Sequence, residues 1–317
     1  MTAERESEVE IRVEGLYKSF DEHAVLRGID LTILTGDFVA VVGGSGCGKT
    51  VLLNHLLGLM QPDTGRVLVS APDLHGRGFE MVRRSDGDRK PLPDRHHRPR
   101  LISLGFGRDD RKHVAEDAPV SPGLPMVDMA GLSTDELDEI HTHWGVVFQR
   151  NALFSGSVLD NIGLWLEEVR HLGDAAIDTI AAEVLSAVGL PHHQDFLDSR
   201  VDSLSGGMAK RIAIARALAM APRCMFFDEP TTGLDPVTAA QIQDLLLASH
   251  GEGASMRTTV IITHDKDLLS RLRPRVVMLH EGRVSFDGPF EDFEASDSPI
   301  IRPYFELMPI LHQRGGI

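Results

Sequence analysis

The chain has 317 residues, of which 42% are apolar and 25% charged, and its formal net charge is −15. A chain of this length can bury a real core, as one large domain or as two modest ones. The acidic balance argues against a sequence-independent grip on nucleic acid, which needs a basic face, so no nucleic-acid partner is expected.

Apolar and polar residues alternate over residues 9–35, which predicts two or three strands of an antiparallel edge sheet. An apolar run at 38–42 then leads into a Gly-rich stretch, and a segment of helical character follows. The stretch reads Gly43-Gly44-Ser45-Gly46-Cys47-Gly48-Lys49-Thr50. This strand–loop–helix order fits the phosphate-binding P-loop, G-x-x-x-x-G-K-S/T.

The residue types of this loop suit phosphate chemistry. Glycines let the backbone wrap closely and point its N–H groups at phosphate oxygens, and the following helix adds the positive end of its dipole. Lys49 is expected to reach the β and γ phosphates, and the Thr50 hydroxyl to bind Mg²⁺. The loop alone leaves GTPases, kinases and several classes of ATPase open.

Residues 61–65 are typical of a turn, and residues 66–70 of a strand. Residues 71–140 differ in character, because they are rich in Gly, Pro and charge. Eleven Lys or Arg fall between Arg77 and Lys112, whereas 114–140 holds acidic residues and no Lys or Arg. We interpret this part as a partly flexible insertion with its charges segregated by sign, and expect a helix to begin near Ser133.

Regular structure resumes with a buried strand at 144–148, which ends in Gln149. Residues 157–190, 208–219 and 236–249 are expected to be helical, and the Gly-Gly sequence before 208 marks a helix start. Short apolar strands are predicted at 224–227 and 258–263, and a hairpin around Glu281 and Gly282. Strands that alternate with helices indicate a mainly parallel, three-layer α/β core.

Two carboxylates, Asp228 and Glu229, directly follow the apolar strand at 224–227. After a P-loop this pattern is typical of a Walker B motif, in which Asp228 would hold Mg²⁺ through water. Glu229, the next residue, is placed to act as a general base on the attacking water. Without the P-loop, a helix-capping carboxylate would explain an acidic pair equally well.

The stretch Leu204-Ser205-Gly206-Gly207-Met208 supplies a second set of Ser and Gly N–H groups at a helix start, and so a second anion site. It resembles the signature motif of ATP-binding cassette (ABC) ATPases. With the P-loop and Asp228-Glu229, it makes residues 9–288 similar to an ABC-type nucleotide-binding protein. The resemblance implies ATP and Mg²⁺ as cofactors.

The same resemblance assigns the remaining site residues. Gln149 matches the Q-loop glutamine, which contacts Mg²⁺ and the attacking water, and His264 matches the switch histidine, which contacts the γ-phosphate. Gly233-Leu234-Asp235 resembles the D-loop. Phe20 occupies the position of the aromatic residue that stacks on adenine, with Tyr17 as the alternative.

The fold class implied is α/β, with a P-loop NTPase core of ABC type, an antiparallel β edge sheet and a helical subdomain. Residues 1–288 would form the nucleotide-binding domain, with the helical subdomain at about 154–203 and the insertion at about 71–140. Residues 289–317 would form a C-terminal tail, whose apolar residues pack on their own domain or across a dimer. In the family two chains pack head-to-tail, so that each ATP lies between one P-loop and the other signature. A second copy, or a similar chain, is therefore an expected partner.

The stretches 148–162 and 204–211 resemble the ATPases of the Mla and Mce phospholipid-transport systems. This implies an ATP-hydrolysing transporter subunit that works with integral-membrane permease subunits and with lipid-binding Mce-type proteins. Two alternatives stay open: a transporter subunit for a polar solute, and a soluble ABC ATPase acting on DNA or ribosomes.

The expected location is cytoplasmic, peripheral on the inner (plasma) membrane face. No apolar run approaches the roughly 20 residues that span a bilayer, and the acidic first residues lack the apolar core of a signal peptide. Two cysteines, Cys47 and Cys224, cannot form a disulfide framework and suit a reducing compartment.

Overall fold

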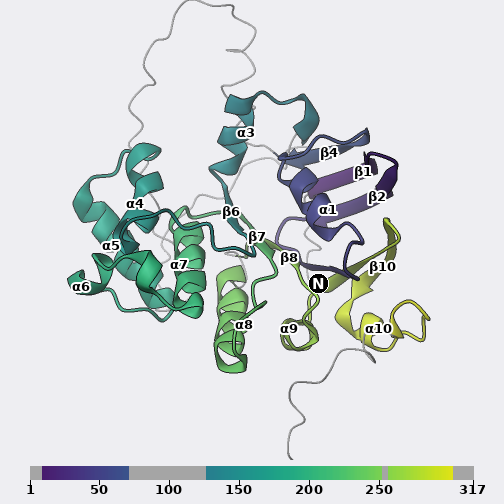
Figure 1. The fold of residues 1–317 in the computed structure, drawn as a ribbon. Helices are drawn as coiled ribbons and strands as arrows, with labels where there is room; N and C mark the ends of the chain where they lie inside the picture. Colours follow the sequence, from purple (N-terminus) through teal and green to yellow (C-terminus); the bar gives the residue numbers. More distant parts are fainter. Residues whose placement is uncertain (1–8, 71–125, 252–255, 303–317) are drawn as a thin grey trace, which may run out of the picture.

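The computed structural model of the protein describes residues 9–70, 126–251 and 256–302. Most of the predicted insertion, 71–125, and most of the apolar tail, 303–317, lie outside the described residues. Within the described ranges, helices pack around two sheets (Figure 1), and the buried side chains form three cores. No helix in these ranges combines the length and the apolar character of a membrane-spanning segment.

The smaller sheet is antiparallel and has the order β2-β1-β4-β5. Its strands are β1 (Val9–Phe20), β2 (His23–Leu34), β4 (Thr64–Ser70) and β5 (Met126–Asp128). The alternation over residues 9–35 predicted such strands, and most of its apolar residues are buried, among them Ile11, Ile29 and Ile33. The antiparallel edge sheet is therefore confirmed.

Residues 126–140 were counted in the insertion, but they form regular structure that begins with a strand of this sheet. β5 pairs with β4, and the 3-10 turn η1 (Met129–Gly131) leads to α3 (Thr134–His141). Ser133 and Glu136 form the capping box that starts α3, as its sequence indicated. The sequence did not reveal β5, because a strand of only a few residues is too short to show an alternation of apolar and polar residues. Met129 and Ile140 are buried by packing against segments far away in the sequence, which local patterns do not show.

The larger sheet has the order β10-β9-β3-β8-β7-β6, and all its strands are parallel except β10. The strands are β3 (Phe38–Gly43), β6 (Trp144–Val147), β7 (Cys224–Asp228), β8 (Thr258–Ile262), β9 (Arg275–His280) and β10 (Arg283–Pro289). The carboxyl ends of parallel strands meet at one edge of a sheet. This edge therefore gathers the residues that follow β3, β6, β7 and β8.

Helices cover both faces of the larger sheet. Along β7 the side chains alternate: Phe226 packs in the core with α1 (Lys49–Leu56) and the antiparallel sheet, whereas Phe227 packs in the core of the opposite face. That opposite face is covered by α4 (Val158–Glu168), α5 (Asp174–Ala187), α7 (Gly206–Ala219) and α8 (Pro236–His250). The helical group also contains α6 (Gln194–Leu197) and η2 (Val201–Ser203). Thus α1 and α7 lie on opposite faces of one sheet (Figure 1).

A third, smaller core lies under α9 (Lys266–Leu272) and α10 (Phe290–Glu294). Phe290, Phe293 and Ile301 are buried in it against strands β3 and β9. The first residues of the predicted tail, as far as they are described, therefore pack on their own domain. The predicted α/β class, parallel core and helical group are confirmed.

Candidate functional site

The P-loop leaves β3 and runs into α1 through three glycines in the left-handed half of backbone space. Gly43, Gly46 and Gly48 have φ values of 148°, 76° and 105°. A Cβ atom on Gly43 would lie 2.4 Å from the Leu279 carbonyl oxygen and 2.6 Å from Cys47 Sγ, so the loop is folded tightly against β9. A Cβ atom on Gly44 or Gly46, in contrast, would meet no atom within 4 Å.

Lys49 begins α1 and folds back over the loop. Its Nζ donates to the carbonyl oxygens of Gly43 at 2.8 Å and Gly44 at 3.0 Å, which holds the ammonium within the curve of the loop. Thr50, the next residue, is exposed. The sequence-predicted phosphate ligands, Gly43 to Thr50, are thus gathered at the helix N-terminus, where backbone N–H groups favour an anion.

A pocket of about 520 Å³ extends from the P-loop along the start of β2. It is lined by His23, Ala24, Val25, Arg27, Gly46, Cys47, Glu281 and Gly282. The β9–β10 turn is fixed there because the backbone N–H of Arg27 donates to the Gly282 carbonyl at 2.8 Å. Phe20, the predicted adenine-stacking residue, pairs across the β1–β2 hairpin with His23, which lines this pocket. The sequence did not indicate that the β9–β10 turn lines this pocket, because that turn and the P-loop are more than two hundred residues apart.

Phe20 and Tyr17 are exposed to a similar extent, at 42% and 44%, but their rings differ in what they contact. The Tyr17 ring lies against Gly28 of β2, where a Cβ atom would come within 2.8 Å of the Tyr17 hydroxyl. Phe20 is 42% exposed, and Lys18 Nζ lies 5.7 Å from its ring centroid, over one face of the ring. A planar base can stack on the other face.

The predicted Walker B carboxylates and the switch histidine come together at the carboxyl edge of the parallel sheet. Asp228 ends β7, and burial and the neighbouring Glu229 raise its pKa, while Lys49 and Lys210 oppose the rise. His264 Nδ1 lies 2.8 Å from Glu229 Oε1, so the predicted base and the predicted γ-phosphate contact are hydrogen-bonded to each other. Such a pair can hold a proton acceptor and a second polar group close to an attacking water.

Glu229 is held in an uncommon backbone conformation. Its φ is 47°, in the left-handed region that side chains other than Gly rarely adopt, and its N–H donates to Ile262 of the neighbouring strand at 2.9 Å. The Thr232 hydroxyl donates to Glu229 Oε2 at 3.1 Å, so both carboxylate oxygens have a partner. Thr232 was missed from the sequence, where it is one of two adjacent threonines with nothing to distinguish it.

Gln149 follows β6, the strand next to β7, and its backbone is held by Lys210 of α7. The signature residues begin α7: Ser205 Oγ accepts from the Met208 N–H at 3.3 Å and caps the helix. Gly207 packs on α8, because a Cβ atom there would lie 2.5 Å from Thr238 Cγ2. Ser205, Gly206 and Gly207 are therefore on the helical face of the sheet, away from the P-loop helix of the same chain.

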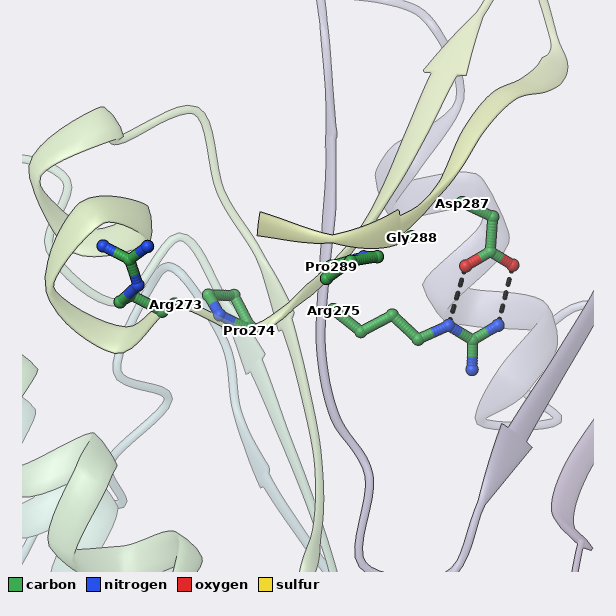
Figure 2. A pocket seen from close by; sticks show the side chains of 6 residues that line it. All are labelled: Arg273, Pro274, Arg275, Asp287, Gly288 and Pro289. Carbon is green, nitrogen blue, oxygen red and sulfur yellow. Dashed lines mark hydrogen bonds and ion pairs between the residues drawn. The ribbon is translucent and has the colours of Figure 1, made fainter. Parts of the chain in front are cut away.

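A second pocket, of about 540 Å³, is lined by residues of β9, β10 and the preceding turn (Figure 2). Its two guanidinium groups already have carboxylate partners. Arg275 makes two bonds of 2.7 Å to Asp287, and Arg273 bonds to Glu291 at 2.8 Å. Arg275 pairs with Val39 at the start of β3, whereas the P-loop follows the end of that strand, so this pocket lies at the opposite edge of the sheet. We place the site at the P-loop edge.

The donor set at the P-loop edge fits a nucleotide with Mg²⁺. Among the described residues no group of three or more His, Cys, Asp or Glu could hold a metal by itself. The predicted Mg²⁺ ligands are instead one carboxylate (Asp228), one hydroxyl (Thr50) and one amide (Gln149). Such a sparse oxygen set suits Mg²⁺, which is usually held by one or two carboxylates together with substrate phosphates.

Comparison with known proteins establishes the family. The ABC transporter family matches residues 26–97 and 113–232, so the chain belongs to this family. It is an ATPase subunit of an ABC transporter, with ATP and Mg²⁺ as cofactors.

Three curated relatives illustrate the range of the family. Protein TRIGALACTOSYLDIACYLGLYCEROL 3, chloroplastic, of Arabidopsis thaliana is 29% identical over 317 residues, covering 95% of this chain and 74% of that protein. Probable ribonucleotide transport ATP-binding protein mkl of Mycobacterium tuberculosis is 29% identical over 297 residues, covering 93% of this chain and 66% of that protein. Arginine/ornithine transport ATP-binding protein AotP of Pseudomonas aeruginosa is 29% identical over 282 residues, with coverages of 88% and 90%. The chain thus spans just under two thirds of mkl and larger shares of the other two.

Two solved structures share the fold. The structure of cbiO1 from Clostridium perfringens, part of the ABC transporter complex cbiONQ, has a TM-score of 0.64 and 25% identity, covering 95% of this chain and 96% of that one. The dimeric structure of MJ0796, a bacterial ABC transporter cassette, has a TM-score of 0.63 and 25% identity, with coverages of 88% and 98%. The ABC type of the predicted α/β fold is confirmed.

The assignment of Phe20 can be tested with two matched substitutions. Phe20→Leu keeps an apolar side chain but removes the ring, so ATP affinity should fall about threefold to tenfold, as expected for the loss of one aromatic stacking contact. Tyr17→Leu, the control, should change affinity less than twofold, because that ring lies on Gly28. Calorimetric titration with ATP measures both. A loss confined to Tyr17→Leu would transfer the adenine contact to Tyr17.

Proposed function

We propose that this chain hydrolyses ATP for a membrane transporter of phospholipid or another lipid, through a separate permease. In this proposal it is peripheral on the cytoplasmic face of the inner (plasma) membrane and pairs head-to-tail with a second copy. Glu229 acts as the general base, His264 and Gln149 orient the γ-phosphate and the attacking water, and the signature of the second copy completes each site.

The proposal of a separate permease rests on an apolar groove beside Gln149. It has a volume of about 290 Å³ and lies between α3, β6 and α7. Its lining residues are Leu57, Leu59, His141, Trp144, Val146, Phe148, Arg216, Ala217 and Met220. A groove of this character can receive an amphipathic helix from a membrane partner. Because Phe148 precedes Gln149, a partner seated here would touch the segment that carries a predicted catalytic residue.

An exposed aromatic residue lies on the same segment and is held in place. Phe154 is 51% exposed, yet its backbone N–H donates to Asn161 Oδ1 at 2.8 Å and its carbonyl accepts from Asn161 Nδ2 at 3.0 Å. Arg216, which lines the groove, stacks on the Phe154 ring at 5.2 Å. An exposed apolar side chain on a fixed backbone is suited to a protein contact rather than to solvent.

The lipid substrate is supported by sequence likeness. The stretches 148–162 and 204–211 resemble Mla and Mce ATPases, and one relative bears a glycolipid in its name. Lipid-binding Mce-type proteins would then be further members of the complex. A polar solute is the second candidate, because the arginine/ornithine relative is equally identical at 29%. An action on DNA or ribosomes is disfavoured by the net charge of −15.

The groove makes a prediction about the partner. Leu59 is 59% exposed at its rim, so Leu59→Glu should place a charge in the contact and reduce co-purification of the permease at least about tenfold. The control, Leu247→Glu, alters a 48% exposed leucine on α8 that does not line the groove and should keep the permease bound. Equal recovery of permease with both variants would remove the groove from the proposal.

The substrate is tested on the complex purified from its native membrane and reconstituted in vesicles. For a lipid transporter, ATP hydrolysis should drive movement of labelled phospholipid, and Glu229→Gln should stop it while ATP still binds. Arginine, ornithine and ribonucleotides other than ATP should neither stimulate hydrolysis nor accumulate. ATP-driven accumulation of one of these solutes, without movement of phospholipid, would replace the lipid proposal with the polar-solute one.

A further inference from the structure

Lys210 is a buried cation at the junction of three predicted motifs. It lies on α7, five positions after the signature residue Ser205, and is only 3% exposed. Its Nζ donates to the carbonyl oxygens of Phe148 at 3.1 Å and Gln149 at 2.9 Å. The signature helix is therefore bonded directly to the backbone that carries the predicted Q-loop glutamine.

Burial of an ammonium group is unfavourable unless the group is paired, because it loses its hydration. Burial lowers the pKa of Lys210 to about 8, and the charge of Asp228 acts in the opposite direction. An apolar residue would suit a helix whose neighbouring residues Ile212 and Ala213 are buried in the core. The ammonium of Lys210 is stabilised by its two hydrogen bonds to carbonyl oxygens and by the nearby charge of Asp228. Its role at this place is to bond α7 to the segment that carries Gln149.

A second cation on the same helix holds the far part of the segment. Arg216 Nη1 donates to the Ala152 carbonyl at 3.0 Å, and its guanidinium lies over the Phe154 ring. Ala152 has a φ of 46°, a backbone conformation that needs outside support in a residue other than Gly. Thus α7 holds the segment 148–154 at both ends, by Lys210 and by Arg216.

We propose that Lys210 is a positioning residue for ATP hydrolysis, which fixes Gln149 beside Asp228 and couples the signature helix to it. The inference rests on the proposed role of Gln149 at the hydrolysis site. In this arrangement a shift of the α7 N-terminus, where the signature lies, moves the Gln149 backbone with it. Substitution of Lys210 should therefore affect turnover much more than nucleotide binding, since the P-loop lies across the sheet from α7.

A double-mutant cycle on the full-length chain separates positioning from general stability. Lys210→Met should lower the single-turnover rate of hydrolysis about tenfold or more, with ATP affinity changed less than twofold. Lys210→Gln keeps an N–H donor and should recover most of the rate. In a Gln149→Ala background, Lys210→Met should cost less than about twofold, because the group it positions is gone.

The control removes a neighbouring charge from the same helix. Arg211 bonds to the Gln241 side chain and the Gly189 carbonyl, away from Gln149, so Arg211→Met should keep the rate within about twofold. The proposal is overturned if Lys210→Met costs the same with and without Gln149, or if Arg211→Met costs as much. If Gln149→Ala leaves the rate unchanged, Lys210 has nothing to position and the proposal also fails, whereas the ATPase assignment stands. Should Lys210→Met not fold, Lys210→Ala, which likewise lacks an N–H donor, takes its place in the cycle under the same criteria.

Discussion

The alternation of side chains along β7 determines where chemistry can occur in this protein. Phe226 and Phe227 pack into cores on opposite faces of one sheet, so the P-loop helix α1 and the signature helix α7 are separated by that sheet. The loop before α1 and the start of α7 both carry Ser and Gly residues whose N–H groups favour an anion. The two anion sites of one chain therefore do not face each other, and a second copy supplies the opposing one in the proposed dimer.

The parallel arrangement of the strands brings together what is distant in the sequence. Asp228 ends β7 and Glu229 follows it, His264 follows β8 and Gln149 follows β6, all at the carboxyl edge of the same sheet. Local contacts then orient these side chains: His264 and Thr232 bind the two oxygens of Glu229, and Lys210 holds the Gln149 backbone. The sheet brings these residues close together, and the hydrogen bonds fix their orientation.

The parts of the site that could be predicted differ from the others in how far apart in the sequence the interacting residues lie. The P-loop, the signature helix start and the acidic end of β7 could be predicted, because adjacent residues determine each of them. The pocket wall at Glu281 and Gly282, the bond from Lys210 and the insertion of Met126–Asp128 into the antiparallel sheet depend on segments far apart in the chain. Thr232 and Lys210 could not be singled out either, since nothing in their neighbourhood distinguishes them from ordinary helix and turn residues.

In the proposed dimer, the signature of one chain serves the nucleotide of the other. The most direct measurement is sedimentation velocity with Mg²⁺-ATP on the slowly hydrolysing variant Glu229→Gln, with and without Ser205→Arg. We expect Glu229→Gln alone to form an ATP-dependent dimer, and Ser205→Arg to keep it monomeric while the monomer binds ATP with nearly unchanged affinity. Loss of ATP binding by the Ser205→Arg monomer, or a dimer that forms equally well with both substitutions, would contradict this arrangement.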